Sequence, residues 1–196
     1  MTIFSQLHLA HKAFGTDSLV TPIPTPRMVS WQHGDEDTII LNVDGSALNN
    51  PGKAGYGGLM RKHGGSFLRG FFGSVGIPNI LHAEIQALLT GIKLCWEAGY
   101  RKLMCFSDSL HVVQLVMKDI SRFHHYANLL ELIQNYLAKD WFIYIQHILR
   151  EGNSCADILA KLGAKSSDHL VTFDEPLPCL SHALLGDALG VSFSRT

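Results

Sequence analysis

The stretch LNVDGSALNNPGKAGYGGLMR, residues 41–61, decides the fold class of this chain. It begins as an apolar strand that carries one carboxylate, Asp44, and then turns at NNPG before a second strand candidate that is rich in glycine. TIILNVD, residues 38–44, is apolar nearly throughout, which is typical of a buried central strand. A single carboxylate at the end of such a strand, followed by so many turn residues, is the feature that the rest of the sequence must explain.

The composition indicates a folded protein rather than a disordered one. Among the 196 residues, 46% are hydrophobic and 17% are charged, which is enough for one domain with a core and flanking segments. No apolar run is long enough to cross a membrane. The N-terminal stretch, MTIFSQLHLAHKAF, lacks the basic start and the A-x-A-like cleavage site of a secretory signal. We therefore expect an intracellular protein with no membrane partner, in the nucleus or the cytoplasm.

Charge and metal-ligand residues exclude several kinds of site. The formal net charge of −1 gives no general attraction for nucleic acid, so such binding must come from a local patch or from metal ions. The 11 histidines lack the spacing of a zinc site. The 4 cysteines form no CxxC pair, and the neighbours of Cys95 and Cys105 indicate buried apolar positions.

The chain divides into three segments. Residues 1–36 contain TPIPTPR and WQHGDE, which indicate an extended, proline-containing linker with little core of its own. Residues 37–165 carry regular strand and helix patterns and form the predicted domain. Residues 166–196 contain PLPCL and a weakly apolar end, and we expect a loop-like, poorly packed extension.

Hydrophobic periodicity predicts strands and helices in a definite order. GYGGLMR and SFLRGFF are strand candidates separated by the turn residues Lys62–Gly65, which is typical of a hairpin. Two further strands are predicted at KLMCFSD (102–108) and WFIYIQHIL (141–149). Helices are predicted at HAEIQALLTGIKLCWEAG (82–99, with Gly99 as its C-terminal cap), SLHVVQLVMK (109–118), YANLLELIQNYLAK (126–139) and NSCADILAKLGA (153–164, with Asn153 or Ser154 as its N-cap).

This order predicts an α/β fold. The first three strands are joined by short turns, so they pair antiparallel. The last two strands return through helices, so they pair parallel by right-handed crossovers. We therefore expect a mixed five-stranded sheet with helices on both faces.

Four carboxylates fall at comparable places in this pattern. Asp44 ends the first strand and Asp108 ends the fourth. Glu84 lies in the first turn of the first helix, and Asp157 lies in the first turns of the last helix. The carboxyl ends of strands and the starts of the following helices gather at one edge of an open α/β sheet. We therefore expect the four side chains to converge there.

Such a cluster predicts divalent cations. Two like charges about 4 Å apart repel by roughly 4 kcal/mol at an effective dielectric of about 20. Oxygen ligands select hard ions such as Mg²⁺ or Mn²⁺, and two ions roughly 3.5–4 Å apart can activate a water in phosphodiester cleavage. Taken alone, Glu84 is more often a partner of the helix dipole, and Asp108 before Ser109 could simply cap a helix.

The strings around these acids resemble a known family. DGSALNNPGKAGYGG, HAEIQAL, SDS and REGNSCADILAKLGA are similar to the four motifs of type 1 ribonuclease H, in the same order and spacing. More narrowly, residues 37–165 resemble the plant ribonuclease H-like, or reverse-transcriptase-like, domains at the end of non-LTR retroelement polyproteins. The first and last motifs are specific, whereas HAEIQAL and SDS are weak on their own. The resemblance implies an RNase H-like fold and a retrotransposon-derived origin.

The resemblance also implies catalytic and metal-binding roles. Asp44 would contact both of two Mg²⁺ ions, for which Mn²⁺ could substitute. Glu84, Asp108 and Asp157 would complete the set of ligands. Members of the family commonly carry a catalytic histidine before the last helix, and His147 lies ten residues before Asp157.

Substrate-binding residues follow from the same motifs. Gly45, Ser46 and Asn50 match positions that approach the RNA strand, although NPG also fits an ordinary turn. Ser109 could orient the preceding aspartate or contact the substrate. Arg150 could bind the scissile phosphate and so competes with the histidine as the additional element, or it is a solvated loop charge. Basic residues are otherwise scattered, so we expect weak, salt-sensitive binding.

Three functions compete for this site. The resemblance implies an endonuclease, expected to be monomeric, that hydrolyses the RNA strand of RNA–DNA hybrids and leaves 5′-phosphate and 3′-hydroxyl ends. The alternative is a catalytically inactive nucleic-acid-binding remnant of a retroelement. A 3′–5′ exonuclease of similar architecture is a third possibility, but such proteins usually have D-x-E in the first motif, whereas this chain has D-G-S.

Overall fold

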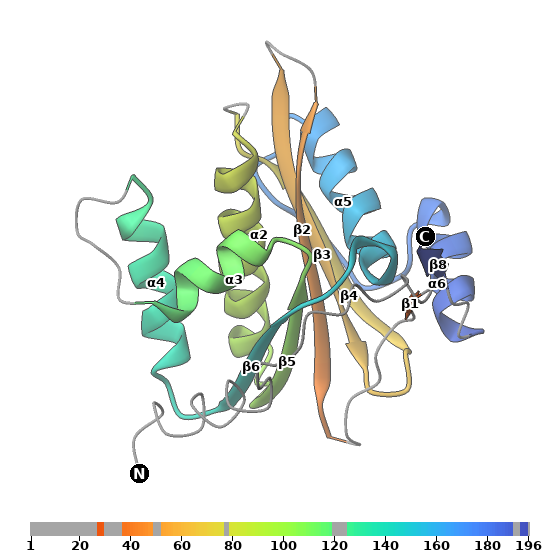
Figure 1. The fold of residues 1–196 in the computed structure, drawn as a ribbon, viewed down its shortest axis with the longest axis horizontal. Coiled ribbons are helices and arrows are strands. Elements are labelled where there is room, and N and C mark those ends of the chain that lie inside the picture. Colours follow the sequence, from red (N-terminus) through yellow and green to blue (C-terminus); the bar gives the residue numbers. More distant parts are fainter. Residues whose placement is uncertain are drawn as a thin grey trace, which may run out of the picture.

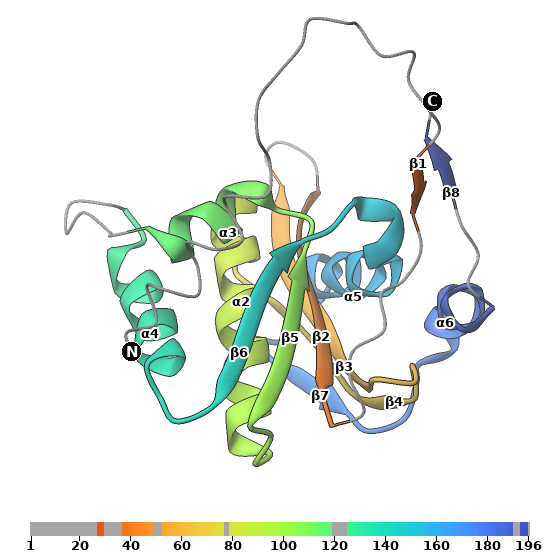
Figure 2. The ribbon, with the colours of Figure 1, turned by 60° about the horizontal axis from the view of Figure 1, so that its bottom comes forward.

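The computed structural model describes residues 27–29, 37–48, 52–76, 79–118, 125–189 and 193–195. The predicted linker, residues 1–36, therefore lies outside the described residues except for the short strand β1 (Arg27–Val29). This strand pairs antiparallel with β8 (Phe193–Arg195) in a separate two-stranded sheet (Figure 2).

The main sheet is mixed, as the sequence predicted. Its strands are β2 (Ile39–Leu48), β3 (Lys53–Lys62), β4 (Phe67–Ser74), β5 (Lys102–Ser107), β6 (Phe142–His147) and β7 (Val171–Phe173). They lie in the order β6-β5-β2-β3-β4-β7, with β2, β5 and β6 mutually parallel (Figure 1). The expected number of five strands is corrected to six, because β7 from the C-terminal extension pairs antiparallel with β4.

Strand β2 is longer than the sequence predicted. It runs through Asp44 to Leu48, because Asp44 to Leu48 continue to pair with β3. Asp44 is therefore in the strand interior rather than at its end. The parallel pairing of β2 with β5 nevertheless stops one residue earlier, where Val43 lies opposite Ser107. Asp44 and Asp108 consequently lie beside each other at the edge where β5 ends.

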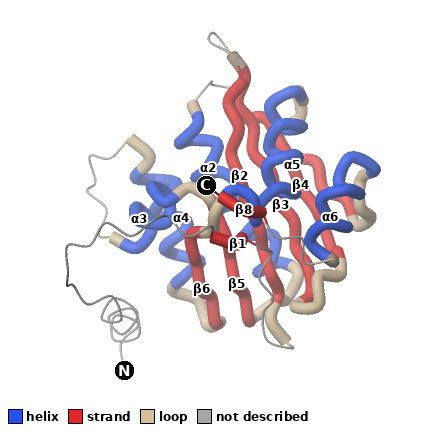
Figure 3. Tube along the Cα trace, turned by 45° about the vertical axis from the view of Figure 1, so that its right-hand side comes forward, coloured by secondary structure: helices blue, strands red, loops and turns tan. Residues whose placement is uncertain are grey.

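Helices cover both faces of the sheet (Figures 1 and 3). One face carries α2 (Ile80–Glu97), α3 (Leu110–Met117) and α4 (Ala127–Leu137), and the other carries α5 (Ser154–Lys165). Gly99 follows α2 at a φ of 84°, which confirms the predicted glycine cap. Within the described part of the chain, no helix has both the length and the apolar character needed to span a membrane.

The two faces of β2 have different chemistry. Leu41 and Val43 are fully buried and pack with the apolar side of α2, including Leu88. The alternate residues, Asn42 and Asp44, point to the other face, because side chains alternate along a strand. Polar residues on that face are also buried, so they need partners from β3 and from the start of α5.

The C-terminal extension packs against the domain, so the expectation of a loop-like tail is wrong. After β7 it forms a 3₁₀ turn, η2 (Pro178–Leu180), and the helix α6 (Ser181–Ala188), on the same side of the sheet as α5 (Figure 2). Leu180 is 0% exposed and lies in an apolar cluster with Leu59 and Leu159. The turn-forming PLPCL string positions this leucine, which explains how so short an extension is held.

Candidate metal centre

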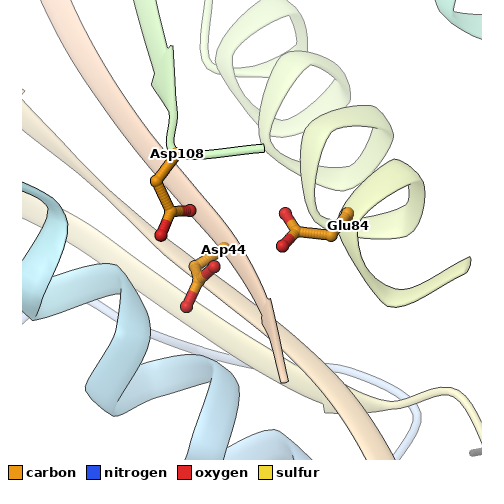
Figure 4. Close-up of side chains that lie close together, drawn as sticks. All are labelled: Asp44, Glu84 and Asp108. Atoms are coloured by element: carbon orange, nitrogen blue, oxygen red, sulfur yellow. The ribbon is translucent and has the colours of Figure 1, made fainter. Parts of the chain in front are cut away.

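Three of the four predicted acids meet at the edge of the sheet. Asp44 comes from β2, Asp108 follows β5, and Glu84 projects from the first turns of α2 (Figure 4). One oxygen of each carboxylate lies within 4.8 Å of one from each of the other two. Asp44 and Glu84 are buried, with 4% and 8% of their surface exposed. The topology brings these acids together because α2 begins, and β5 ends, beside the middle of β2.

Gly45 allows α2 to approach the sheet at this point. A Cβ atom on Gly45 would lie 2.5 Å from the backbone nitrogen of Glu84 and 2.8 Å from the carbonyl carbon of Ala83. Such distances are far shorter than van der Waals contact, so no other residue fits without moving the helix. The Gly45 N–H also donates a hydrogen bond to the Glu84 carboxylate. Gly45 thereby holds Glu84 beside Asp44.

Burial and mutual repulsion make two of these acids hard to ionise without a cation. Burial, followed by the charges of Glu84 and Asp108, raises the pKa of Asp44 to about 10. Burial and the charge of Asp108 raise the pKa of Glu84 to about 8, against the lowering effect of the Gly45 hydrogen bond. A divalent cation between the carboxylates would reverse both effects.

The donor set fits a hard divalent cation. The three ligands are carboxylate oxygens, which suit Mg²⁺ or Mn²⁺ better than softer metals. Among the described residues, Glu84 Oε2 is a buried acceptor with no hydrogen-bond donor. An unsatisfied buried acceptor of this kind calls for an explanation, and a cation would provide one.

Asp157 lies next to this group but is paired with cationic side chains. It lies in the first turn of α5, as predicted, and its charge is close enough to raise the pKa of Asp44. Its Oδ1 accepts a hydrogen bond from Arg150 at 2.7 Å, and its Oδ2 accepts one from Lys161 at 2.5 Å. Burial raises the pKa of Asp157, but the hydrogen bonds from Lys161 and Arg150 bring it below its usual value. Asp157 is therefore ready to ionise, with both oxygens already engaged.

His147 and Ser109 both lie beside Asp108. His147 is the last residue of β6, opposite Ser107, and its Nε2 is 3.2 Å from the carbonyl oxygen of Asp108. Ser109 occupies the N-cap position of α3, but its side chain makes no capping bond, and its N–H donates to Ser107 Oγ.

The other predicted substrate-binding residues have different surroundings. Ser46 is a buried residue of β2, opposite Gly55. Asn50 lies outside the described residues. Arg150 begins the 3₁₀ turn η1 (Arg150–Asn153). Its side chain is 68% exposed, although it forms an ion pair with Asp157.

Two polar residues, Asn153 and Lys161, belong to the site although the sequence did not predict them there. Asn153 occupies the N-cap position of α5, as predicted, but its side chain makes no capping bond and instead donates to the Val43 carbonyl at 2.9 Å. Its Nδ2 also lies 3.5 Å from Asp108 Oδ1. Lys161, the second partner of Asp157, follows it by four residues on one helix face, a spacing that could have indicated the pair.

Known proteins are similar to this chain over most of the described domain. The model of the reverse transcriptase-like family matches residues 42–163. A protein of Arabidopsis thaliana named “Putative ribonuclease H protein” is 30% identical over 176 residues, which cover 90% of this chain. The chain spans 28% of the length of that relative.

Solved structures share the fold. The N-terminal RNase H domain of a Mycobacterium tuberculosis protein is 24% identical, with a TM-score of 0.59, over 65% of this chain and 94% of that domain. The ribonuclease H1 LC11, solved in complex with an RNA/DNA hybrid, is 22% identical, with a TM-score of 0.58, over 65% of this chain and 96% of its own. The family model covers more than half of the sequence and these structures match its architecture. The chain therefore belongs to the reverse transcriptase-like family, and its domain has the RNase H-like fold.

Proposed function

We propose that this protein is a divalent-metal-dependent endonuclease that hydrolyses the RNA strand of RNA–DNA hybrids. The observation that carries the proposal is the set of three converging carboxylates, Asp44, Glu84 and Asp108, with Asp157 beside them. The relationship to ribonuclease H proteins supports a nuclease, and a structural neighbour has been solved with an RNA/DNA hybrid. The two-ion Mg²⁺ site, the products with 5′-phosphate and 3′-hydroxyl ends, and the retroelement origin belong to the same proposal.

The chain's own residues divide the work of this reaction. Asp44, Glu84 and Asp108 would hold the cations, and Asp157 would join them after releasing one of its basic partners. Bound Mg²⁺ ions would supply an activated water and stabilise the leaving oxygen. Arg150, exposed and close to the acids, would face a phosphate of the substrate once it leaves Asp157. Contacts to ribose 2′-hydroxyls would select RNA, since that group distinguishes RNA from DNA.

A second candidate function is binding of nucleic acid without cleavage. It is favoured by the double pairing of Asp157, whose two oxygens bond to Arg150 and Lys161. If those pairs persist when cations and substrate bind, the fourth ligand is lost. The protein would then bind hybrid but cut it poorly.

Cleavage of a labelled RNA–DNA hybrid distinguishes the two functions. With Mg²⁺ or Mn²⁺ the parent should cut the RNA strand, and Asp44→Asn and Glu84→Gln should each lower the rate by at least about 10²-fold, because each removes a ligand charge. Glu97→Gln is the matched control for Glu84→Gln, since Glu97 lies on the same helix but its side chain is 53% exposed and pairs with Lys93.

Two outcomes of the cleavage assay would contradict the proposed endonuclease site. Hybrid binding by a folded parent that never cleaves would support the binding module. Equal cleavage by Asp44→Asn and the parent would show that the activity belongs to another site or a contaminant.

A further inference from the structure

The C-terminal helix supplies the partner of a buried cation. The side chain of Arg61, on β3, is only 1% exposed. Its Nη1 donates to Asp187 Oδ2 of α6 at 2.6 Å. Asp187 is itself mostly buried, with 14% of its side chain exposed, and its Oδ2 also lies 3.7 Å from the Cys155 thiol of α5. Leaving a buried guanidinium without its carboxylate is strongly destabilising, so α6 is bound to the sheet by charge as well as by Leu180.

Arg61 also fixes the direction of the next hydrogen bond. Its Nη2 donates to Asn42 Oδ1 at 2.8 Å, and Asn42 is 1% exposed. A guanidinium only donates, so the amide oxygen of Asn42 must face Arg61 and its NH₂ group must face away. That NH₂ group donates to Asn153 Oδ1 at 3.1 Å.

The amide of Asn153 is oriented by its hydrogen bond with Asn42. Since its oxygen accepts from Asn42, its NH₂ group points to the acidic edge, where it donates to the Val43 carbonyl and approaches Asp108 Oδ1 at 3.5 Å. Asn153 is 1% exposed and directly precedes α5, whose first turn carries Asp157. Each hydrogen bond in this series therefore depends on the one before it.

We propose that Asp187 is a positioning residue for the acidic site. Its carboxylate holds Arg61, Arg61 sets the amide orientation of Asn42 and Asn153, and Asn153 fixes Asp108 and the start of α5. The C-terminal extension thus contributes to the arrangement of the cation ligands without touching them. The inference deepens the proposed function, because it concerns the same site.

The test compares two aspartate–arginine pairs in the full-length chain. Asp187→Ala removes the buried pair, and Asp174→Ala removes the Arg69–Asp174 pair, which also joins β4 to the extension at 2.6 Å but is 39% and 69% exposed. The double variant Arg61→Met/Asp187→Leu removes both buried charges. It is included because loss of the carboxylate beside a buried guanidinium could prevent folding, whereas an apolar replacement of the pair is often tolerated.

Two measurements separate positioning from a merely structural role. In metal-free protein, NMR reports the side-chain NH₂ resonances of Asn42 and Asn153. Titration with MnCl₂, followed by calorimetry, reports cation affinity. We expect the resonances to shift and exchange faster in Asp187→Ala and in the double variant, and Mn²⁺ affinity to fall by about tenfold, as is typical when a residue that orients metal ligands is lost. Asp174→Ala should change neither quantity.

Unchanged Asn42 and Asn153 resonances in the variants would overturn the inference. So would shifted resonances with Mn²⁺ affinity within about twofold of the parent, because the network would then not position the acids. Neither measurement uses cleavage. A parent that binds Mn²⁺ but cuts no hybrid therefore contradicts the proposed function and leaves the comparison of variants intact.

Discussion

Asp44 and Glu84 oppose folding when no cation is bound. Burial and neighbouring carboxylates raise their pKa values to about 10 and about 8, whereas the same groups in an unfolded chain titrate near 4. A raised pKa means that the folded state keeps protons that the unfolded state releases. The stabilisation that the folded state gains from holding these two protons is therefore complete below about pH 4. It is lost as the pH rises toward 8, where Glu84 ionises, and then 10, where Asp44 ionises.

The first prediction follows from this loss of stability at rising pH. In EDTA, the melting temperature should fall between about pH 5 and about pH 9, and Mg²⁺ should remove most of that fall by neutralising the acids. Asp44→Asn should flatten the pH dependence and be more stable than the parent at about pH 9 without metal. Thermal denaturation followed by circular dichroism measures both. The same steep fall in Asp44→Asn would show that Asp44 is not responsible.

His147 gives a second prediction at the residue scale. We propose that it takes part in proton transfer, and its Nε2 lies 3.2 Å from the Asp108 carbonyl. His147→Ala should then lower kcat for hybrid cleavage by about 10²-fold, and His147→Asn should be equally slow, because an amide cannot exchange a proton near neutral pH. An Asn variant with nearly full activity would instead mean that the side chain only donates a hydrogen bond to Asp108.

Residue positions were predictable where they depend on the backbone. Asp44, Glu84, Asp108 and Asp157 could be placed from the sequence because each stands at a recognisable point of a strand or helix. The partners of Asp157 could not, because they depend on the directions of long side chains. Asn153 stands at the predicted N-cap position of α5, but its side-chain hydrogen bonds were not predictable for the same reason. Its position before α5 predicts a cap, but a buried acceptor and donor on β2 compete for its amide.

At the scale of elements, glycines on β3 let α5 lie close to the sheet. A Cβ atom on Gly57 would come within 2.5 Å of the Leu159 carbonyl carbon, and one on Gly55 within 1.9 Å of the Ala164 nitrogen. These contacts are to helix backbone, which cannot move aside without shifting the whole of α5. Gly55 and Gly57 therefore let α5, which carries Asp157, lie against the sheet. The sequence predicted a glycine-rich strand at this place but not this packing role.

This contact gives the third prediction. Gly57→Ala should destabilise the protein by about 1–3 kcal/mol through overpacking and should lower cleavage by displacing α5. Gly64→Ala is the control, because a Cβ there would meet nothing within 4 Å. It should stay within about 0.5 kcal/mol of the parent. Urea unfolding measures both variants, and equal stability of the two would contradict the proposed close contact.

The order of the elements was predictable, whereas their ends and the sixth strand were not. The hairpin of β3 and β4 and the parallel strands β5 and β6 follow from turn residues and helical crossovers, and the structure confirms them. The length of β2 was missed because polar Ser46 and the glycine before it do not resemble a strand. Their pairing with β3 nevertheless continues it. Strand β7 has only three residues, too few for a periodic signal.

At the scale of the whole molecule, the extension is part of the folded unit. The mycobacterial RNase H domain accounts for 65% of this chain, whereas the match to the Arabidopsis relative covers 90%. Residues 166–189 add β7 to the sheet edge, bury Leu180 and pair with Arg61. We therefore propose that the functional domain extends beyond residue 165 to α6. Patterning alone did not indicate this, because one buried leucine and one buried ion pair make no periodic signal.

The final prediction tests this attachment in the full-length chain. Leu180 is 0% exposed and packs with Cys155, Ala156 and Leu159, so its side chain joins the extension to the first turns of α5. Leu180→Ala should cost about 2–5 kcal/mol of unfolding free energy in urea. Leu185→Ala, five residues later in α6 and 56% exposed, should cost less than about 0.5 kcal/mol. Since α5 carries Asp157, Leu180→Ala should also speed amide hydrogen exchange in the first turns of that helix, whereas Leu185→Ala should not. Equal losses in the two variants would mean that the extension does not support α5.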